Sequence, residues 1–153
     1  MHAAVVAVIR MEIKMRSILL IYLGICALID IKTRKIPAYF MLAGVAGAVT
    51  YFAVMACTHQ RNAVELLMAV LPAAALYSLS LAGGCLGKGD IIVFLIIGLC
   101  MPRKENLGIY CFSFLFAAIG SAILLICKKG TGKTRIPFIP YIFAASCIGM
   151  YIF

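Results

Sequence analysis

The sequence predicts an all-α integral membrane protein with about six transmembrane helices. Hydrophobic residues make up 65% of the 153 residues, only 12% are charged, and the mean hydropathy is +1.13. A soluble domain of this size needs more polar surface to cover its core. Several apolar runs reach the roughly 20 residues that a helix needs to cross a bilayer, where helical hydrogen bonding satisfies the backbone.

Six apolar segments follow one another along the chain, separated by short loops. We place them at residues 17–31, 38–57, 63–82, 86–102, 107–127 and 136–153. Because the connections are short, helices adjacent in sequence are expected to be antiparallel neighbours. Residues 1–16 are interpreted as an N-terminal extension, in which a later methionine could be the true start, and residues 17–153 as a single membrane domain.

Basic residues in the loops predict the orientation. The loops after the first, third and fifth spans carry more Lys and Arg than the opposite side, as cytoplasmic loops do. We therefore expect a multi-pass plasma-membrane protein with these loops in the cytoplasm and both termini outside. The net charge of +9 then indicates contact with anionic lipids, and no basic face interleaved with aromatic residues indicates nucleic-acid binding. The basic residues of these loops are Lys32, Arg34, Lys35, Lys88, Lys128, Lys129, Lys133 and Arg135.

Seven cysteines lie mostly inside the predicted spans, and none forms a Cys-x-x-Cys pair. Zinc sites need closely spaced thiolates or imidazoles, so we expect neither a metal site nor a cofactor. Buried thiols that act as small apolar residues are the simpler interpretation.

Two of the five acidic residues are predicted at matching depths. Asp30 ends an apolar run that begins at Ser17, and Asp90 opens one that closes at Pro102. At about 1.5 Å per residue, both lie roughly 18–20 Å from the outer boundary of a core about 30 Å thick. Both carboxylates are therefore expected just inside the cytoplasmic face. Ionisable groups at such a depth are usually functional, although capping of a helix at a wet interface would explain either aspartate alone.

Two facing carboxylates can hold one proton between them, which provides a general base and a general acid. This is the chemistry of aspartic proteolysis, in which water attacks the peptide carbonyl directly. No serine has a histidine at a suggestive position, so no other nucleophile is evident. The glycines before Asp90 would let a substrate strand approach, but Gly83 and Gly87 also form a Gly-x-x-x-Gly pair that could serve helix packing alone.

Three separated segments carry a family resemblance. Residues 30–37 read Asp-Ile-Lys-Thr-Arg-Lys-Ile-Pro, residues 87–90 read Gly-Lys-Gly-Asp, and residues 135–140 read Arg-Ile-Pro-Phe-Ile-Pro. In order and spacing, over residues 17–153, they resemble the motifs of the type IV prepilin peptidases, membrane aspartic proteases that trim prepilin leaders. The resemblance implies that Asp30 and Asp90 are the catalytic pair. It implies substrate-positioning or motif roles for Lys32, Ile36, Pro37, Gly87, Lys88, Gly89, Pro137, Phe138 and Pro140.

The chain departs from the family pattern at two positions. Ala38 stands where the family often has Asn, and Ile92 stands where a Lys is common. The cysteine-containing N-terminal portion of larger members is missing, so the chain resembles their short form, and N-methylation of the product is not expected.

Alternative functions remain open at this point. A small proton-coupled transporter or channel subunit could use the buried aspartates as a relay, and a structural subunit could use the glycines for packing. If the chain is a peptidase, its partner is a prepilin or a pseudopilin-like substrate, and the sequence does not distinguish among pilins, pseudopilins and archaeal-type flagellins.

Overall fold

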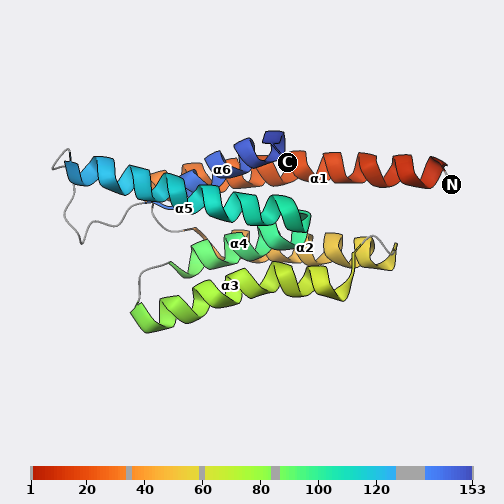
Figure 1. The fold of residues 1–153 in the computed structure, drawn as a ribbon, viewed down its shortest axis with the longest axis horizontal. Helices are drawn as coiled ribbons and strands as arrows, with labels where there is room; N and C mark the ends of the chain where they lie inside the picture. Colours follow the sequence, from red (N-terminus) through yellow and green to blue (C-terminus); the bar gives the residue numbers. More distant parts are fainter. Residues whose placement is uncertain (1, 34–35, 59–60, 84–86, 127–136, 153) are drawn as a thin grey trace.

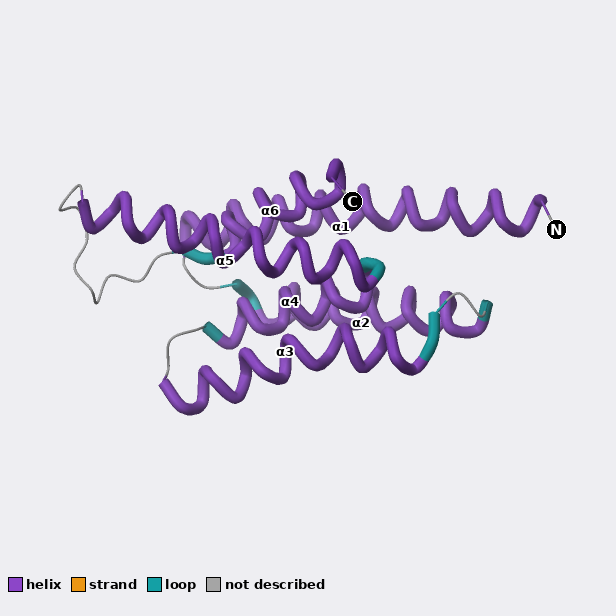
Figure 2. The backbone as a smooth tube through the Cα atoms, in the orientation of Figure 1, coloured by secondary structure: helices purple, strands orange, loops and turns teal. Residues whose placement is uncertain are grey.

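Helices make up nearly all of the described part of the chain, which comprises residues 2–33, 36–58, 61–83, 87–126 and 137–152 of a computed structural model (Figure 2). These residues contain six helices and no strands, which confirms the predicted all-α class. In chain order the helices are α1 (His2–Thr33), α2 (Ala38–Cys57), α3 (Ala63–Gly83), α4 (Lys88–Cys100), α5 (Arg103–Ile126) and α6 (Ile139–Ile152).

The six helices form two groups of three. Helices α5 and α6 pack together and α6 packs on α1, while α2 and α3 both pack on α4. We call these sets the α1 group (α1, α5, α6) and the α4 group (α2, α3, α4), which lie above and below one another in Figure 1. They meet along a seam where α4 contacts α1 and α5, and α3 contacts α5. The prediction that sequence neighbours pack together is therefore only partly correct, because α2 packs mainly on α4.

Three of the described helices are long and apolar enough to cross a membrane, and a shorter apolar helix joins them. The three spans are Ala38–Cys57, Ala63–Leu81 and Glu105–Ile123, and the shorter helix is Ile139–Met150. Their faces turned away from the bundle carry large apolar side chains, such as Leu42, Leu81 and Ile123. Together with the all-helical fold, this agrees with a polytopic membrane protein.

Helix α1 departs most from its predicted length, and α4 and α6 are each four residues shorter than predicted. The expected first span at residues 17–31 is only the second half of α1, which is helical from His2 and extends beyond the other helices in Figure 1. Helix α4 has only 13 residues, about 20 Å at 1.5 Å per residue. It is the most enclosed helix, because eight of its residues are buried.

Close backbone contact holds α3 against α4. A Cβ atom added at Gly98 of α4 would lie 2.7 Å from the carbonyl oxygen of Ala69 in α3. Only glycine lets the two helices approach this closely, as in small-residue packing within membranes. This contact fixes α4 inside its group.

The opposite end of the bundle from Asp30 and Asp90 carries two ion pairs, and we call it the arginine end. Arg16 of α1 pairs with Glu105 of α5, and Arg61 pairs with Glu65 one turn later at 3.2 Å. Arg61 also donates hydrogen bonds to the carbonyl oxygens of Cys100 and Met101, at 3.3 and 2.9 Å. These carbonyls lie at the carboxyl end of α4, so Arg61 caps that helix.

Two of these charged residues are buried, although each lies beside the boundary of an apolar span. Arg61 is only 7% exposed and Glu105 only 5% exposed. Each has an opposite charge beside it: Glu105 pairs with the distant Arg16, and Arg61 pairs with Glu65 one turn later.

Candidate functional site

Asp30 lies in the last turns of α1, at the end of the bundle that we call the aspartate end. It is 9% exposed, and its Oδ2 atom accepts a hydrogen bond of 3.4 Å from the backbone N–H of Ile139. Ile139 is the first residue of α6, so the positive end of that helix dipole faces the carboxylate. Helix α6 thus offsets the cost of placing an acidic side chain near the carboxyl end of α1.

The start of α6 explains why this N–H has no partner within the helix and can bond Asp30. The carbonyl of Phe138 accepts the first helical bonds, from Tyr141 at 3.1 Å and Ile142 at 3.3 Å. Pro140 has no N–H to leave unsatisfied in the first turn. Ile139 therefore keeps a backbone donor that points out of the helix towards Asp30.

Asp90 lies in the first turn of α4, at the same end of the bundle. Gly87 precedes the helix with φ −69° and ψ 140°, and its carbonyl oxygen accepts a hydrogen bond of 3.1 Å from the backbone N–H of Asp90. A carboxylate in the first turn is favoured by the helix dipole. A Cβ atom at Gly87 would lie 3.1 Å from Asp90 Oδ2, so glycine leaves room for the carboxylate there.

The structure brings the two aspartates together across the seam. Asp30 belongs to the α1 group and Asp90 to the α4 group, and their carboxylates are close enough to repel each other electrostatically. Two carboxylates in this relation can share one proton, so that one acts as a base while the other acts as an acid. Their depth in the membrane and their catalytic role stay predictions.

The remaining motif residues fall into three sets. Pro137, Phe138 and Pro140 surround the α6 amide that reaches Asp30, as described above. Ile36 and Pro37 lead into α2, where Pro37 is the N-cap and its carbonyl accepts from Phe40 at 3.1 Å.

The third set lies around Asp90 and at the end of α1. Gly89 lies next to Asp90, and a Cβ atom there would be in ordinary contact with Met41 at 3.6 Å. Lys32 and Lys88 are exposed at the aspartate end. The basic residues Arg34, Lys35 and those of the loop at 127–136 lie outside the described residues.

Aromatic side chains close the seam beside the aspartates, a feature that the sequence interpretation missed. Phe94, one turn after Asp90, is fully buried. Its ring lies 4.7 Å from Tyr110, 5.8 Å from Phe114 and 5.8 Å from Phe138, measured between centroids. The Tyr110 hydroxyl also donates to the carbonyl oxygen of Phe94 at 2.9 Å. The cluster joins α4, which carries Asp90, to α5 and to the start of α6, whose first amide bonds Asp30.

A second missed feature lies on α1 below Asp30. Cys26, one turn before Asp30, is fully buried, and Tyr22 lies a turn further back on the same helix. The Tyr22 ring stacks on Phe40 of α2 with 5.0 Å between centroids and 8° between planes. These positions have the i, i+4 spacing of one helix face, which could have identified them.

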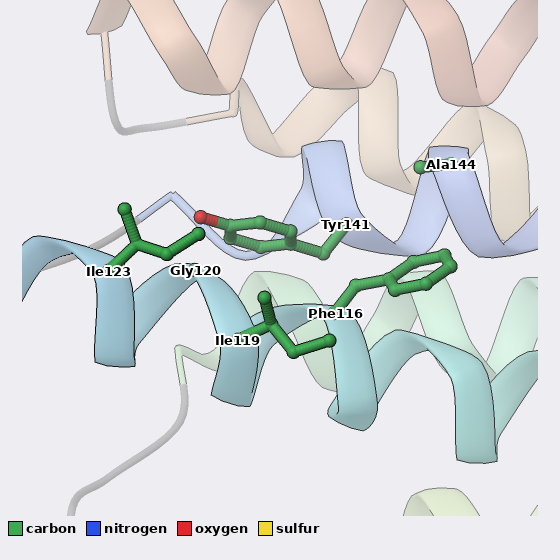
Figure 3. A pocket seen from close by; sticks show the side chains of 6 residues that line it. All are labelled: Phe116, Ile119, Gly120, Ile123, Tyr141 and Ala144. Carbon is green, nitrogen blue, oxygen red and sulfur yellow. The ribbon is translucent and has the colours of Figure 1, made fainter.

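The cavity in Figure 3 is separate from the aspartates. It has a volume of about 510 Å³ and lies between α5 and α6. Its lining is apolar apart from the Tyr141 hydroxyl, and neither aspartate contributes to it. Since it holds no acid or base pair, it is not a candidate for hydrolytic chemistry. Its lining residues are Phe116, Ile119, Gly120, Ile123, Tyr141 and Ala144.

The described residues contain no group of three or more His, Cys, Asp or Glu side chains that could hold a metal ion. The five described cysteines are free, and two of them are buried.

Comparison with known proteins gave one match. A model of the type IV leader peptidase family matches residues 17–153, nearly the whole chain. The match begins where the apolar part of α1 begins, and it includes all three motif segments. No curated protein and no solved structure matched significantly.

Proposed function

The chain belongs to the type IV leader peptidase family, and we propose that it cleaves the leader peptides of type IV prepilins or prepilin-like proteins. We assign the chemistry to Asp30 and Asp90. The observation that best supports this assignment is that the two carboxylates lie near each other across the seam. Asp30 accepts a hydrogen bond from the backbone N–H of Ile139, and Asp90 lies in the first turn of α4.

The proposed reaction is direct hydrolysis. The ionised carboxylate removes a proton from a water molecule as the water oxygen attacks the scissile carbonyl carbon, and the protonated carboxyl donates its proton to the carbonyl oxygen. The tetrahedral intermediate then collapses, the C–N bond breaks, and a carboxyl group returns a proton to the leaving nitrogen. The two aspartates share the proton throughout, so neither is assigned a fixed role.

The proposed cleavage site is the cytoplasmic boundary of the membrane. A prepilin would keep its short basic leader in the cytoplasm and its apolar helix in the bilayer, which would put the scissile bond at the level of the aspartate end. The exposed lysines Lys32 and Lys88 lie at this end, in agreement with a cytoplasmic face. Leader and loops are both basic, so binding would come from the apolar helix rather than from charge pairing.

The test is cleavage of candidate substrates by the purified protein in detergent or liposomes. Prepilins, pseudopilins and an archaeal-type preflagellin would be incubated with it, and the new N-termini would be sequenced. We expect a single cut at the end of one leader class. Asp90→Asn serves as the inactive comparison, and Glu12→Gln is the matched control because Glu12 is the acidic residue on the distant half of α1.

Two results would contradict the proposal. One is the absence of cleavage with every substrate class in the presence of folded protein. The other is proton flux across liposomes that is lost in Asp30→Asn and Asp90→Asn, which would favour the relay function instead.

A further inference from the structure

We propose that Gly44 of α2 is a positioning residue that sets the spacing between Asp30 and Asp90. The inference rests on the proposed function, because it concerns the separation of the same two carboxylates. Gly44 carries no reactive group, and its effect comes from the side chain that it lacks.

Gly44 lies where three helices meet at the seam. A Cβ atom added there would press against the hydroxyl oxygen of Tyr22, lie 2.6 Å from Tyr22 Cζ, and lie 2.9 Å from Ile96 Cδ1. Tyr22 belongs to α1 and Ile96 to α4, the two helices that carry the aspartates. The missing side chain of Gly44 thus leaves room on α2 for Tyr22 of α1 and for Ile96 of α4.

Tyr22 has little freedom to move away from an added methyl group. Its ring is stacked on Phe40, and its hydroxyl donates to the Phe40 carbonyl oxygen at 3.3 Å. Ile96 is only 2% exposed and belongs to the buried core, so it also has little room to move. A methyl group at position 44 would therefore displace a helix rather than only a side-chain tip.

The displacement would reach the aspartates through short, rigid segments. Tyr22 lies eight residues before Asp30, about 12 Å along α1, and Ile96 lies six residues after Asp90, about 9 Å along α4. Met41 adds a second link, because its sulfur lies 4.0 Å from the Tyr22 hydroxyl and its methyl group lies against Gly89. The packing around Gly44 is thus connected to both carboxylates.

Gly47 offers a matched control on the same helix. A Cβ atom added there would have no heavy atom within 4 Å. Gly44→Ala and Gly47→Ala make the same chemical change and the same gain in helix propensity, so a difference between them reports the contact with α1 and α4.

The first measurement is steady-state cleavage of a prepilin. Displacing a catalytic group by about 1 Å can cost roughly 100-fold in rate, so we expect Gly44→Ala to lower kcat between about 10- and 100-fold. KM should stay within about two-fold, because the site for the apolar substrate helix is not altered. For Gly47→Ala, both constants should stay within about two-fold of the unmodified protein.

The second measurement reports the spacing without any peptidase activity. Asp30→Cys and Asp90→Cys would be introduced together after replacement of the seven native cysteines, and a short bifunctional methanethiosulfonate would join them. We expect efficient cross-linking in this background and with Gly47→Ala, and a severalfold slower reaction with Gly44→Ala.

The third measurement is rescue. Adding Tyr22→Phe and Ile96→Val to Gly44→Ala removes two of the atoms that the methyl group would meet, and should restore cross-linking and at least part of kcat. If Gly44→Ala does not fold, as judged by its melting temperature, the triple variant carries the test and is expected to fold and to cross-link.

Equal cross-linking rates in Gly44→Ala and Gly47→Ala would overturn the proposal, as would a triple variant that folds without recovering cross-linking. Failure of the proposed function has a different signature. The cysteine pair would then cross-link as described while no prepilin is cleaved by the unmodified protein.

Discussion

The two ends of the bundle use buried charge in opposite ways. At the arginine end, opposite charges are paired, as in the contacts of Arg16 with Glu105 and of Arg61 with Glu65. At the aspartate end, two acidic side chains from different helix groups lie near enough to interact electrostatically. Opposite charges hold helices together, whereas like charges raise the free energy of the folded state. This difference is the one expected if the arginine end maintains the fold and the aspartate end carries out the proposed hydrolysis.

The largest effect is expected from the aspartates. Asp30→Asn and Asp90→Asn should each lower prepilin cleavage by between about 10²- and 10⁴-fold, because neither variant retains both an acid and a base. Their melting temperatures should be unchanged or higher, since the repulsion between the carboxylates is gone. Activity and thermal unfolding measured on the same preparations check both parts. A large fall in stability would mean that these residues also maintain the fold.

Arg61 should show the reverse pattern. Arg61→Met removes the cap of α4 and leaves Glu65 without this partner, so we expect a loss of about 3 kcal/mol in stability. The folded fraction should retain kcat within about three-fold, because Arg61 lies at the far end of α4 from Asp90. Arg10→Met is the control, since Arg10 is exposed, and it should change stability by less than about 0.5 kcal/mol. Thermal or denaturant unfolding in detergent measures both variants, and equal stabilities would remove the contrast between the two ends.

The smallest effect is expected from the exposed lysines at the aspartate end. Lys32→Ala and Lys88→Ala should each change the activation free energy derived from kcat/KM by less than about 1 kcal/mol, because exposed charges are screened. Raising the salt from about 50 to about 500 mM should likewise change the rate by less than about three-fold. Cleavage assays across this salt range test the point. A steep decline would show that charge pairing, and not the apolar helix, drives recognition.

Local patterns predicted the fold well where composition alone decides it. The bounds of α2 agree with those expected, and α3 differs by one residue, because long apolar runs bounded by polar loops leave little choice. The start of α1 was missed, since its first half mixes charges with a short apolar run. The length of α4 was overestimated, because the helix begins only at Lys88, after a glycine, whereas hydropathy suggests an earlier start.

The site was predictable only in its local parts. The depth estimate placed Asp30 and Asp90 at one level, and the motif glycine at Gly87 has a local reason in its contact with Asp90. The burial of Arg61 and the contact of Gly44 with Tyr22 and Ile96 depend on residues distant in sequence. Such tertiary contacts leave no periodic signal in one chain, so the sequence alone does not indicate them.

The short length of α4 has a consequence for how the protein is made. A helix of 13 residues that begins with Lys88 and Asp90 is too short and too polar at its start to insert into a bilayer alone. It has to enter together with the neighbours that cover it, α2 and α3 from one side and α5 from the other. During biosynthesis, Asp90 would therefore reach its final depth late, when the helices that shield it from lipid are already in place.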